Sequence, residues 1–112
     1  MTDIRDLTAA YVEAFDTRNL DKVAGFFSDE FELTDPEVTA LTPKRDVLTY
    51  IKGLFDGNEE LSFVSHCILV EGNNSVIHFT LTLGKTVLDG VDVISWDGAQ
   101  MTAMHAYLTP RS

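Results

Sequence analysis

Three side chains in this sequence have the chemical types and surroundings that acid–base chemistry needs. Asp92 lies inside an apolar β run, where a carboxyl group is costly unless it is paired, hydrogen-bonded or protonated. Asp35 stands where Pro36 stops a short strand, so it can face the mouth of a pocket and stay ionised, as a general base must. Tyr11 points inward from a helix and can donate a hydrogen bond. One acid can therefore accept a proton while the other remains neutral.

Each of these residues also has a purely structural interpretation. Tyr11 can be a core tyrosine with a satisfied hydroxyl group. Asp35 followed by proline is a common turn or capping pair. Asp92 can be a buried acid that is bonded to Tyr11, to Trp96 or to the backbone. The sequence therefore supports a catalytic and a structural interpretation of each residue.

The first half of the chain has the periodicity of helices. Apolar residues spaced three and four apart share one face in each of three segments, and Thr2 or Asp3 can cap the first of them. Thr42-Pro43 is typical of a helix start, with proline at the first helical position. The predicted helices cover residues 3–17, 20–27 and 42–55, and one short strand covers residues 31–35.

The rest of the chain has the pattern of β-strands. Four runs rich in β-branched and aromatic residues are separated by short turn sequences, and Asp97-Gly98 is a strong hairpin signal. The predicted strands cover residues 61–70, 75–83, 86–96 and 101–109. Because short turns join antiparallel neighbours, the element order predicts an α+β fold with helices on one face of a curved antiparallel sheet.

Both faces of the last hairpin are apolar. If the Asp97-Gly98 loop has three residues, Asp92 pairs with Met104 and Trp96 pairs with Gln100. The predicted inner face holds Leu88, Asp92, Ile94, Trp96, Met104, Ala106 and Leu108. The predicted outer face holds Val87, Val91, Val93, Met101, Ala103, His105 and Tyr107. Three helices cannot cover both faces, so we expect the outer face to pack against a second copy in a homodimer.

Composition limits the possible classes of protein. A chain of 112 residues is the size of one domain. Its net charge of -10 argues against nucleic acid as a partner, and its apolar runs are too short to span a membrane. The single Cys67 cannot form an internal disulfide and the sequence does not open on a secretion signal, so we expect a cytoplasmic protein.

A longer sequence pattern resembles a known superfamily. The segment from Tyr11 to Pro36 reads YVEAFDTRNLDKVAGFFSDEFELTDP, and it is followed by a helix, strands, GVDVISWDG and an AYL ending. This pattern is similar to the nuclear transport factor 2-like superfamily, and within it to the ketosteroid isomerase and SnoaL-like polyketide cyclase branch. The resemblance implies one SnoaL-like domain over residues 1–112, a cystatin-like α+β barrel. Its curved antiparallel sheet would wrap around helices as a cone with a deep apolar pocket.

The resemblance also implies roles for the three residues. Tyr11 matches the tyrosine that donates a hydrogen bond to the substrate oxygen in ketosteroid isomerase. Asp35 matches the general base, and Asp92 matches the acid that stays protonated to share the oxyanion with the tyrosine. The further tyrosines that support the oxyanion donor have no match, because Lys52 stands near the expected place on the third helix.

The remaining candidates complete the expected site. We expect the substrate pocket to be lined by Phe15, Phe55, Phe79, Leu81, Leu83, Ile94, Trp96, Met104 and Leu108. His66 is a reserve acid or base if Asp35 faces solvent. We expect no metal, because the histidines and Cys67 lack the spacing of a zinc motif, and because His66 and Cys67 should point to opposite faces of one strand. His78 and His105 should lie on the outer face.

These expectations define a function and its alternatives. The chain is predicted to be a cofactor-independent enzyme that transfers a proton next to a ketone, on a steroid-like or polyketide-like apolar substrate. One alternative is a non-catalytic dimeric domain that binds a small apolar molecule, and another is a polyketide cyclase or hydrolase of the same superfamily. A pocket filled by Trp96, Phe15 or Phe55 would favour the non-catalytic alternative.

Overall fold

The computed structural model describes residues 3–111, and its elements follow the predicted order. The helices are α1 (Ile4–Asp16), α2 (Leu20–Gly25) and α3 (Lys44–Gly57). The strands are β1 (Phe27–Thr34), β2 (Leu61–Glu71), β3 (Asn74–Leu83), β4 (Thr86–Asp97) and β5 (Gln100–Pro110). The main difference from prediction is that β1 begins four residues early, because α2 already ends at Gly25.

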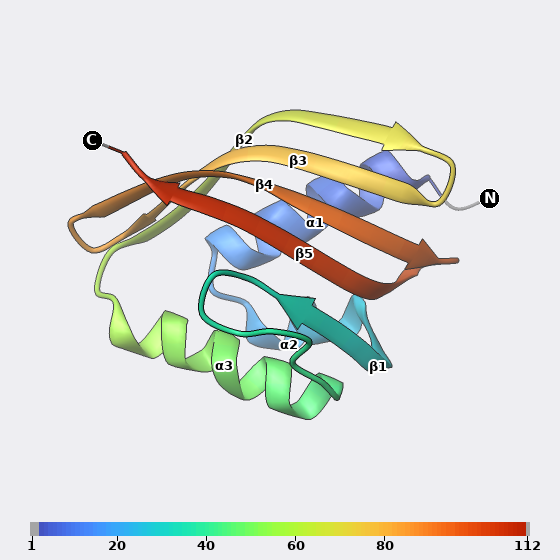
Figure 1. The fold of residues 1–112 in the computed structure, drawn as a ribbon, viewed down its shortest axis with the longest axis horizontal. Helices are drawn as coiled ribbons and strands as arrows, with labels where there is room; N and C mark the ends of the chain where they lie inside the picture. The colour runs from blue at the N-terminus through green and yellow to red at the C-terminus, as the bar shows by residue number, and fades with distance from the viewer. Residues whose placement is uncertain (1–2, 112) are drawn as a thin grey trace.

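The strands form one curved sheet in the order β1-β5-β4-β3-β2. Strands β2 to β5 are antiparallel neighbours, as their short turns predicted, whereas β1 pairs with β5 in parallel. Figure 1 shows the sheet arching over α1, with α3 on the far side of β1. This is the predicted α+β cone, and it stays open because β1 and β2 are both edges of the sheet.

Polar contacts at the helix ends hold the helices around the space under the sheet. Asp3 caps α1 by accepting hydrogen bonds from two backbone N–H groups, whereas Thr2, the other predicted cap, lies outside the described residues. Pro43 is the N-cap of α3 and not its first helical residue. Just beyond α1, the Arg18 guanidinium donates to the carbonyl oxygens of Phe55, Asn58 and Glu59, each at 2.6 Å. These three bonds fix the end of α1 to the end of α3.

The last hairpin has a different register from the predicted one. Asp97 pairs with Gln100, so the loop has two residues and not three, and a bulge follows in which Thr102 is the extra residue. Asp92 therefore pairs with Ala106, and the predicted pairing with Met104 is wrong. Trp96 likewise pairs with Met101 and not with Gln100.

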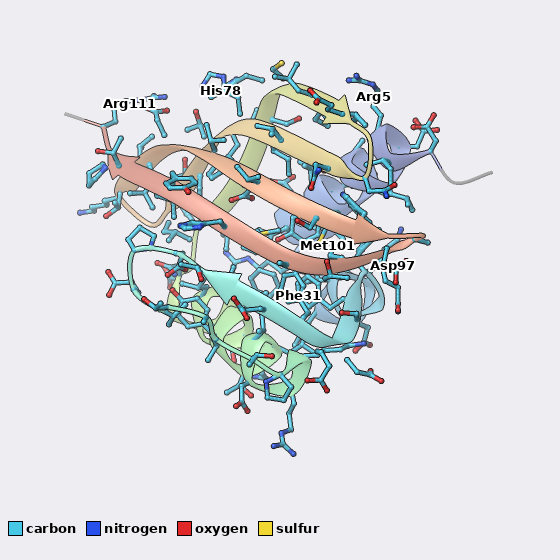
Figure 2. The ribbon with its side chains drawn as sticks, turned by 45° about the vertical axis from the view of Figure 1, so that its right-hand side comes forward. Arg5, Phe31, His78, Asp97, Met101 and Arg111 are labelled. Atoms are coloured by element: carbon cyan, nitrogen blue, oxygen red, sulfur yellow. The ribbon has the colours of Figure 1, made fainter. Side chains whose placement is uncertain are left out.

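Of the residues named above for the two faces, the altered register moves one to the other face. Met101, predicted on the outer face, is fully buried on the inner face opposite Trp96, while Val93 and Tyr107 are exposed on the outer face as predicted. Phe31 and Met101 are fully buried, whereas Figure 2 shows His78 on the outer side of the sheet, away from the helices. The core is consequently a single aromatic-rich layer between the inner face and the helices.

Gly90 lets the cavity wall approach the backbone of β4. It lies on the inner face two residues before Asp92, paired with Phe79 on one side and Leu108 on the other. A Cβ at this position would lie 2.8 Å from the Phe79 ring and 2.5 Å from the Tyr107 carbonyl oxygen. No side chain larger than hydrogen fits unless the ring or the strand moves.

We therefore expect Gly90→Ala to lower the free energy of unfolding by roughly 1–3 kcal/mol, the usual cost of overpacking. Gly53→Ala is the matched control, because Gly53 is exposed inside α3 with nothing within 4 Å of the added methyl group. That change should stabilise the protein by about 0.5–1 kcal/mol. Urea unfolding of both variants measures the two effects, and equal behaviour would contradict the close-approach role of Gly90.

Candidate active site

A cavity of about 70 Å³ lies between the helices and the inner face of the sheet. Its lining is mostly aromatic and aliphatic, and it includes all three residues that the sequence singled out, Tyr11, Asp35 and Asp92. The complete lining is Tyr11, Phe15, Phe27, Phe31, Leu33, Asp35, Tyr50, Ile51, Leu54, Phe63, Phe79, Leu81, Asp92, Met104, Ala106 and Leu108. Residues that are distant in sequence are thus brought to one apolar space.

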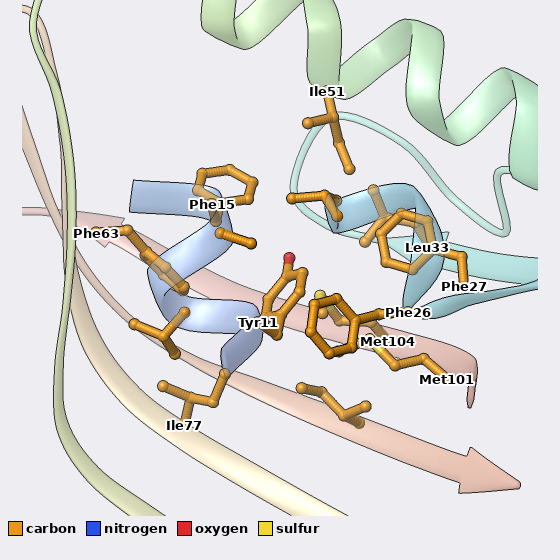
Figure 3. Close-up of a cluster of buried hydrophobic side chains, with 14 of the residues drawn as sticks. Tyr11, Phe15, Phe26, Phe27, Leu33, Ile51, Phe63, Ile77, Met101 and Met104 are labelled. Carbon is orange, nitrogen blue, oxygen red and sulfur yellow. The ribbon is translucent and has the colours of Figure 1, made fainter. Parts of the chain in front are cut away.

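Tyr11 occupies the centre of the aromatic layer. Its ring packs on those of Phe15, Phe26, Phe27 and Phe63, with centroid distances between 5.9 and 6.4 Å. Figure 3 shows its hydroxyl oxygen pointing from α1 toward Ile51 of α3. Burial raises the pKa of this hydroxyl group well above its usual value, and the nearby carboxyl group of Asp92 raises it further. The hydroxyl is therefore a hydrogen-bond donor throughout the neutral range.

Asp92 is the only buried carboxyl group among the described residues, with 4% of its surface exposed. Within residues 3–111, neither the carboxyl group of Asp92 nor the hydroxyl group of Tyr11 forms a side-chain hydrogen bond. Every side-chain nitrogen or oxygen atom there that is completely buried does have a hydrogen-bond partner. The polar ends of both side chains must therefore open onto the cavity. Burial, with a smaller contribution from the charge of Asp35, raises the pKa of Asp92 to about 8. At pH 7 most molecules carry Asp92 as a neutral acid, which can donate a hydrogen bond.

Asp35, in contrast to Asp92, is partly exposed and its carboxylate accepts several hydrogen bonds. It is half-buried just after β1, and its Oδ1 accepts hydrogen bonds from the backbone N–H groups of Glu37 and Val38 at 2.8 and 2.9 Å. Its Oδ2 accepts a third bond, 2.7 Å long, from the hydroxyl group of Tyr50. A carboxylate has about four acceptor positions, so one position on Oδ2 stays available at the cavity.

Tyr50 is the polar residue of the cavity lining that the sequence analysis missed. It lies on α3 three residues after the buried Val47 and four before the lining residue Leu54, so the helical spacing that marked the apolar stripe also pointed to it. Burial and the hydrogen bond to Asp35 both raise its pKa. Lys52, which stands near the position expected for a tyrosine, is exposed and pairs with Asp56.

The structure places five of the nine residues predicted for the pocket lining around this cavity. Phe15, Phe79, Leu81, Met104 and Leu108 line the cavity. Phe55, Leu83, Ile94 and Trp96 do not, because they fill the core around it. Trp96, for example, donates its indole N–H to Ser75 at 2.9 Å and belongs to a separate buried polar contact that includes Thr8. The missed lining residues come mainly from β1 and α3, whose place relative to the sheet the sequence did not specify.

His66 lies away from the cavity, on the outer face. A bulge in β2 between Ser65 and Cys67 shifts the register there, so that Cys67 pairs with the outer residue His78. His66 and Cys67 are both exposed, which corrects the prediction that they point to opposite faces. The His66 ring contacts Thr80 and His78. Its proposed reserve role as an acid or base in the pocket is therefore not supported by its position.

Comparison with protein families identifies the domain. Residues 8–105 match the family described as SnoaL-like domain. The chain belongs to the SnoaL-like family. No curated protein is similar enough in sequence to count as a match. Within the described residues, no helix of this SnoaL-like domain is both long and apolar enough to cross a membrane.

Solved structures confirm the nuclear transport factor 2-like fold. An NTF2-like protein of unknown function from Burkholderia pseudomallei has a TM-score of 0.86 and 16% identity, covering 97% of this chain and 92% of that one. A proposed ketosteroid isomerase from Kribbella flavida has a TM-score of 0.81 and 17% identity, covering 96% and 78%. An LEH-like epoxide hydrolase from M. tuberculosis has a TM-score of 0.78 and 16% identity, covering 94% and 81%. At these identities the likeness shows the fold and not the activity.

The buried carboxyl group of this SnoaL-like domain should make its stability depend on pH. Between an unfolded-state pKa near 3.9 and the folded-state pKa of about 8, the unfolded chain loses the Asp92 proton while the folded protein keeps it. The stability contributed by this group is thus fully present below about pH 4 and is lost as the pH rises toward 8. We expect Asp92→Asn to remove this loss in the free energy of unfolding, which is roughly 4 kcal/mol at pH 7.

Urea unfolding of the wild type and of Asp92→Asn at pH 5 and pH 8 measures the effect. The gain in stability from the substitution should be larger at pH 8. Asp29→Asn, on an exposed position of β1, is the matched control and should show no such difference. An Asp92→Asn gain that is the same at both pH values would mean that this carboxyl group titrates normally in the folded protein.

Proposed function

We propose that this SnoaL-like domain is a cofactor-independent enzyme that moves a proton next to the carbonyl group of an apolar substrate. The observation that carries the proposal is the pair of unpaired donors in one apolar cavity, the Tyr11 hydroxyl and the neutral carboxyl group of Asp92. Two buried polar groups without protein partners are costly, so a ligand oxygen that accepts both hydrogen bonds would bind favourably.

The donor pair suits an oxyanion. When a proton leaves the carbon next to a carbonyl group, the electrons of the C–H bond form a C=C bond and the carbonyl oxygen becomes an enolate. Tyr11 and Asp92 would each donate a hydrogen bond to that oxygen, in a space from which the surrounding phenylalanines exclude most water. Burial keeps both donors protonated in the neutral range, because it raises the pKa of each group.

Asp35 is the proposed base. The acceptor position that remains on its Oδ2 would take the proton from carbon and return it to the same carbon or to another carbon of the enolate. The Tyr50 hydroxyl and the two backbone N–H groups hold the carboxylate in one orientation. The roles of acid and base are therefore divided between two aspartates by their surroundings.

Two alternative functions are less well supported by the cavity. A non-catalytic domain that binds a small apolar molecule is consistent with the mostly apolar lining, but it assigns no role to the unpaired Asp92. The predicted sign of that alternative was a pocket filled by Trp96, Phe15 or Phe55, and of these only Phe15 lines the cavity. A cyclase or hydrolase that uses the same carboxyl groups is the second alternative.

We also propose a cytoplasmic location, which the single Cys67 supports.

Deuterium uptake from D₂O into the position next to a ketone, followed by NMR, tests the proposal without knowledge of the substrate. A panel from cyclopentanone to a 3-ketosteroid should contain a compound whose exchange the protein accelerates. Asp35→Asn should lower that rate by about 10²–10⁴-fold, the usual contribution of a general base. Tyr11→Phe should lower it by about 10²–10³-fold, the usual effect of losing one oxyanion donor.

Glu32→Gln is the matched control, because Glu32 is an exposed carboxylate of β1 that does not line the cavity, and it should keep the wild-type rate. Acceleration that survives Asp35→Asn would remove Asp35 from the role of base. No acceleration of any ketone in the panel would leave the binding alternative as the better description.

We further propose that the outer sheet face pairs with a second copy. This face carries four exposed apolar side chains from β2, β4 and β5, namely Val64, Leu69, Val93 and Tyr107, with exposed fractions between 39% and 59%. A net charge of -10 opposes association elsewhere on the surface, whereas this face offers apolar area for an isologous contact.

Sedimentation equilibrium should then show a dimer that Tyr107→Glu shifts toward monomer, because the substitution buries two carboxylates in a symmetric interface. Thr49→Glu adds the same charge on the exposed side of α3 and should leave the dimer intact. A monomeric wild type, or equal effects of the two substitutions, would contradict this interface.

A further inference from the structure

The size of the cavity limits what can bind beside Asp92. Its volume of about 70 Å³ is roughly half that of a cavity of about 150 Å³ that takes up one benzene ring. A small adjustment at the half-buried rim, where Tyr50, Leu54 and Leu108 lie, can make room for a single ring. Four fused rings need several times this volume. The resting cavity therefore does not fit the steroid-like or polyketide-like substrate that the sequence suggested.

The phenylalanine side chains at the inner end of the cavity cannot move independently of one another. Five phenylalanines line the cavity. Phe27 and Phe31 are stacked with centroids 4.0 Å apart, Phe63 lies 4.8 Å from Phe79, and Phe15 lies 5.0 Å from Phe63. Because interiors are close-packed, displacing one ring requires the movement of its neighbours. These contacts make the inner end of the cavity a fixed limit on the size of the ligand.

The polar groups limit the charge of the ligand. Tyr11 and neutral Asp92 offer two donors at the buried end, while the carboxylate of Asp35 lies at the half-buried end. The lining contains no lysine, arginine or histidine. An anionic ligand would meet the Asp35 charge with no cation to offset it, so a neutral carbonyl compound is favoured.

We infer that the substrate is a small neutral ketone or aldehyde no larger than one ring, about seven non-hydrogen atoms at most. This inference rests on the proposed function, because it places the carbonyl oxygen at Tyr11 and Asp92 and the carbon that loses its proton toward Asp35.

A series of phenols tests the size limit, because a phenol oxygen resembles an enolate oxygen. Isothermal titration calorimetry at pH 7 with phenol, 2-naphthol and a steroidal phenol should show the tightest binding for phenol. The Kd of phenol should be at least about tenfold lower than that of the steroidal phenol. Hydrophobic area alone predicts the reverse order, because each added ring would bury more apolar surface. Tyr11→Phe should weaken the binding of each of the three phenols.

Two matched variants connect the limit to the cavity wall. Phe63 and Phe55 are both buried and both lie 5.0 Å from Phe15, but only Phe63 lines the cavity. Phe63→Leu should therefore improve the binding of 2-naphthol relative to phenol, whereas Phe55→Leu should leave the ratio unchanged. Equal ratios in the two variants would overturn the role of this wall.

The possible failures are distinguishable. A steroidal phenol that depends on Tyr11 and binds as tightly as phenol would overturn the size limit and leave the proposed function standing. Absence of binding by all three phenols, or binding that Tyr11→Phe does not weaken, would remove the oxyanion site. The proposed function and the inferred substrate would then both be wrong.

Discussion

The burial of Asp92 is the constraint on which the site depends. A carboxyl group with almost no exposed surface in an aromatic cavity must be neutral or paired, and no side chain in the described part of the protein pairs with it. The fold keeps it there by strand pairing on both sides, with Ile77 of β3 and Ala106 of β5. Backbone hydrogen bonds and apolar packing therefore hold a group whose own burial is unfavourable. Such an arrangement is typical of functional sites.

The two aspartates at the cavity show how position decides chemistry. Asp35 follows a strand at the rim, where two backbone N–H groups and Tyr50 supply hydrogen bonds to both of its oxygens. Asp92 lies inside a strand, where the backbone groups already pair with neighbouring strands and its side chain meets only the cavity. Residues of one type thus meet opposite environments, and the charge of Asp35 also raises the pKa of Asp92.

The sequence predicted the elements of this fold well because their signals are local. Helical spacing, turn residues and β-branched runs lie within a few positions of each other, and the order of elements then implied the curved sheet. Details that depend on one inserted residue were not predictable in this way. The extra residue Thr102 moved Met101 to the inner face, and the bulge beside Ser65 placed His66 and Cys67 on the same face. Each is a shift of register, which reverses the direction of a side chain.

The pocket lining was predictable mainly where it comes from α1 and from the hairpin strands. Met104 and Leu108 were placed by alternation along β5, whereas Phe31 and Tyr50 line the cavity because β1 pairs in parallel with β5 and because α3 packs on β1. Those contacts join segments separated by many residues, and no short-range pattern specifies them. The same separation explains why the fold does not determine the substrate. The sheet supplies the buried acid, but the helices and β1 supply the walls, so the volume available to a ligand depends on side chains that the fold leaves free to vary.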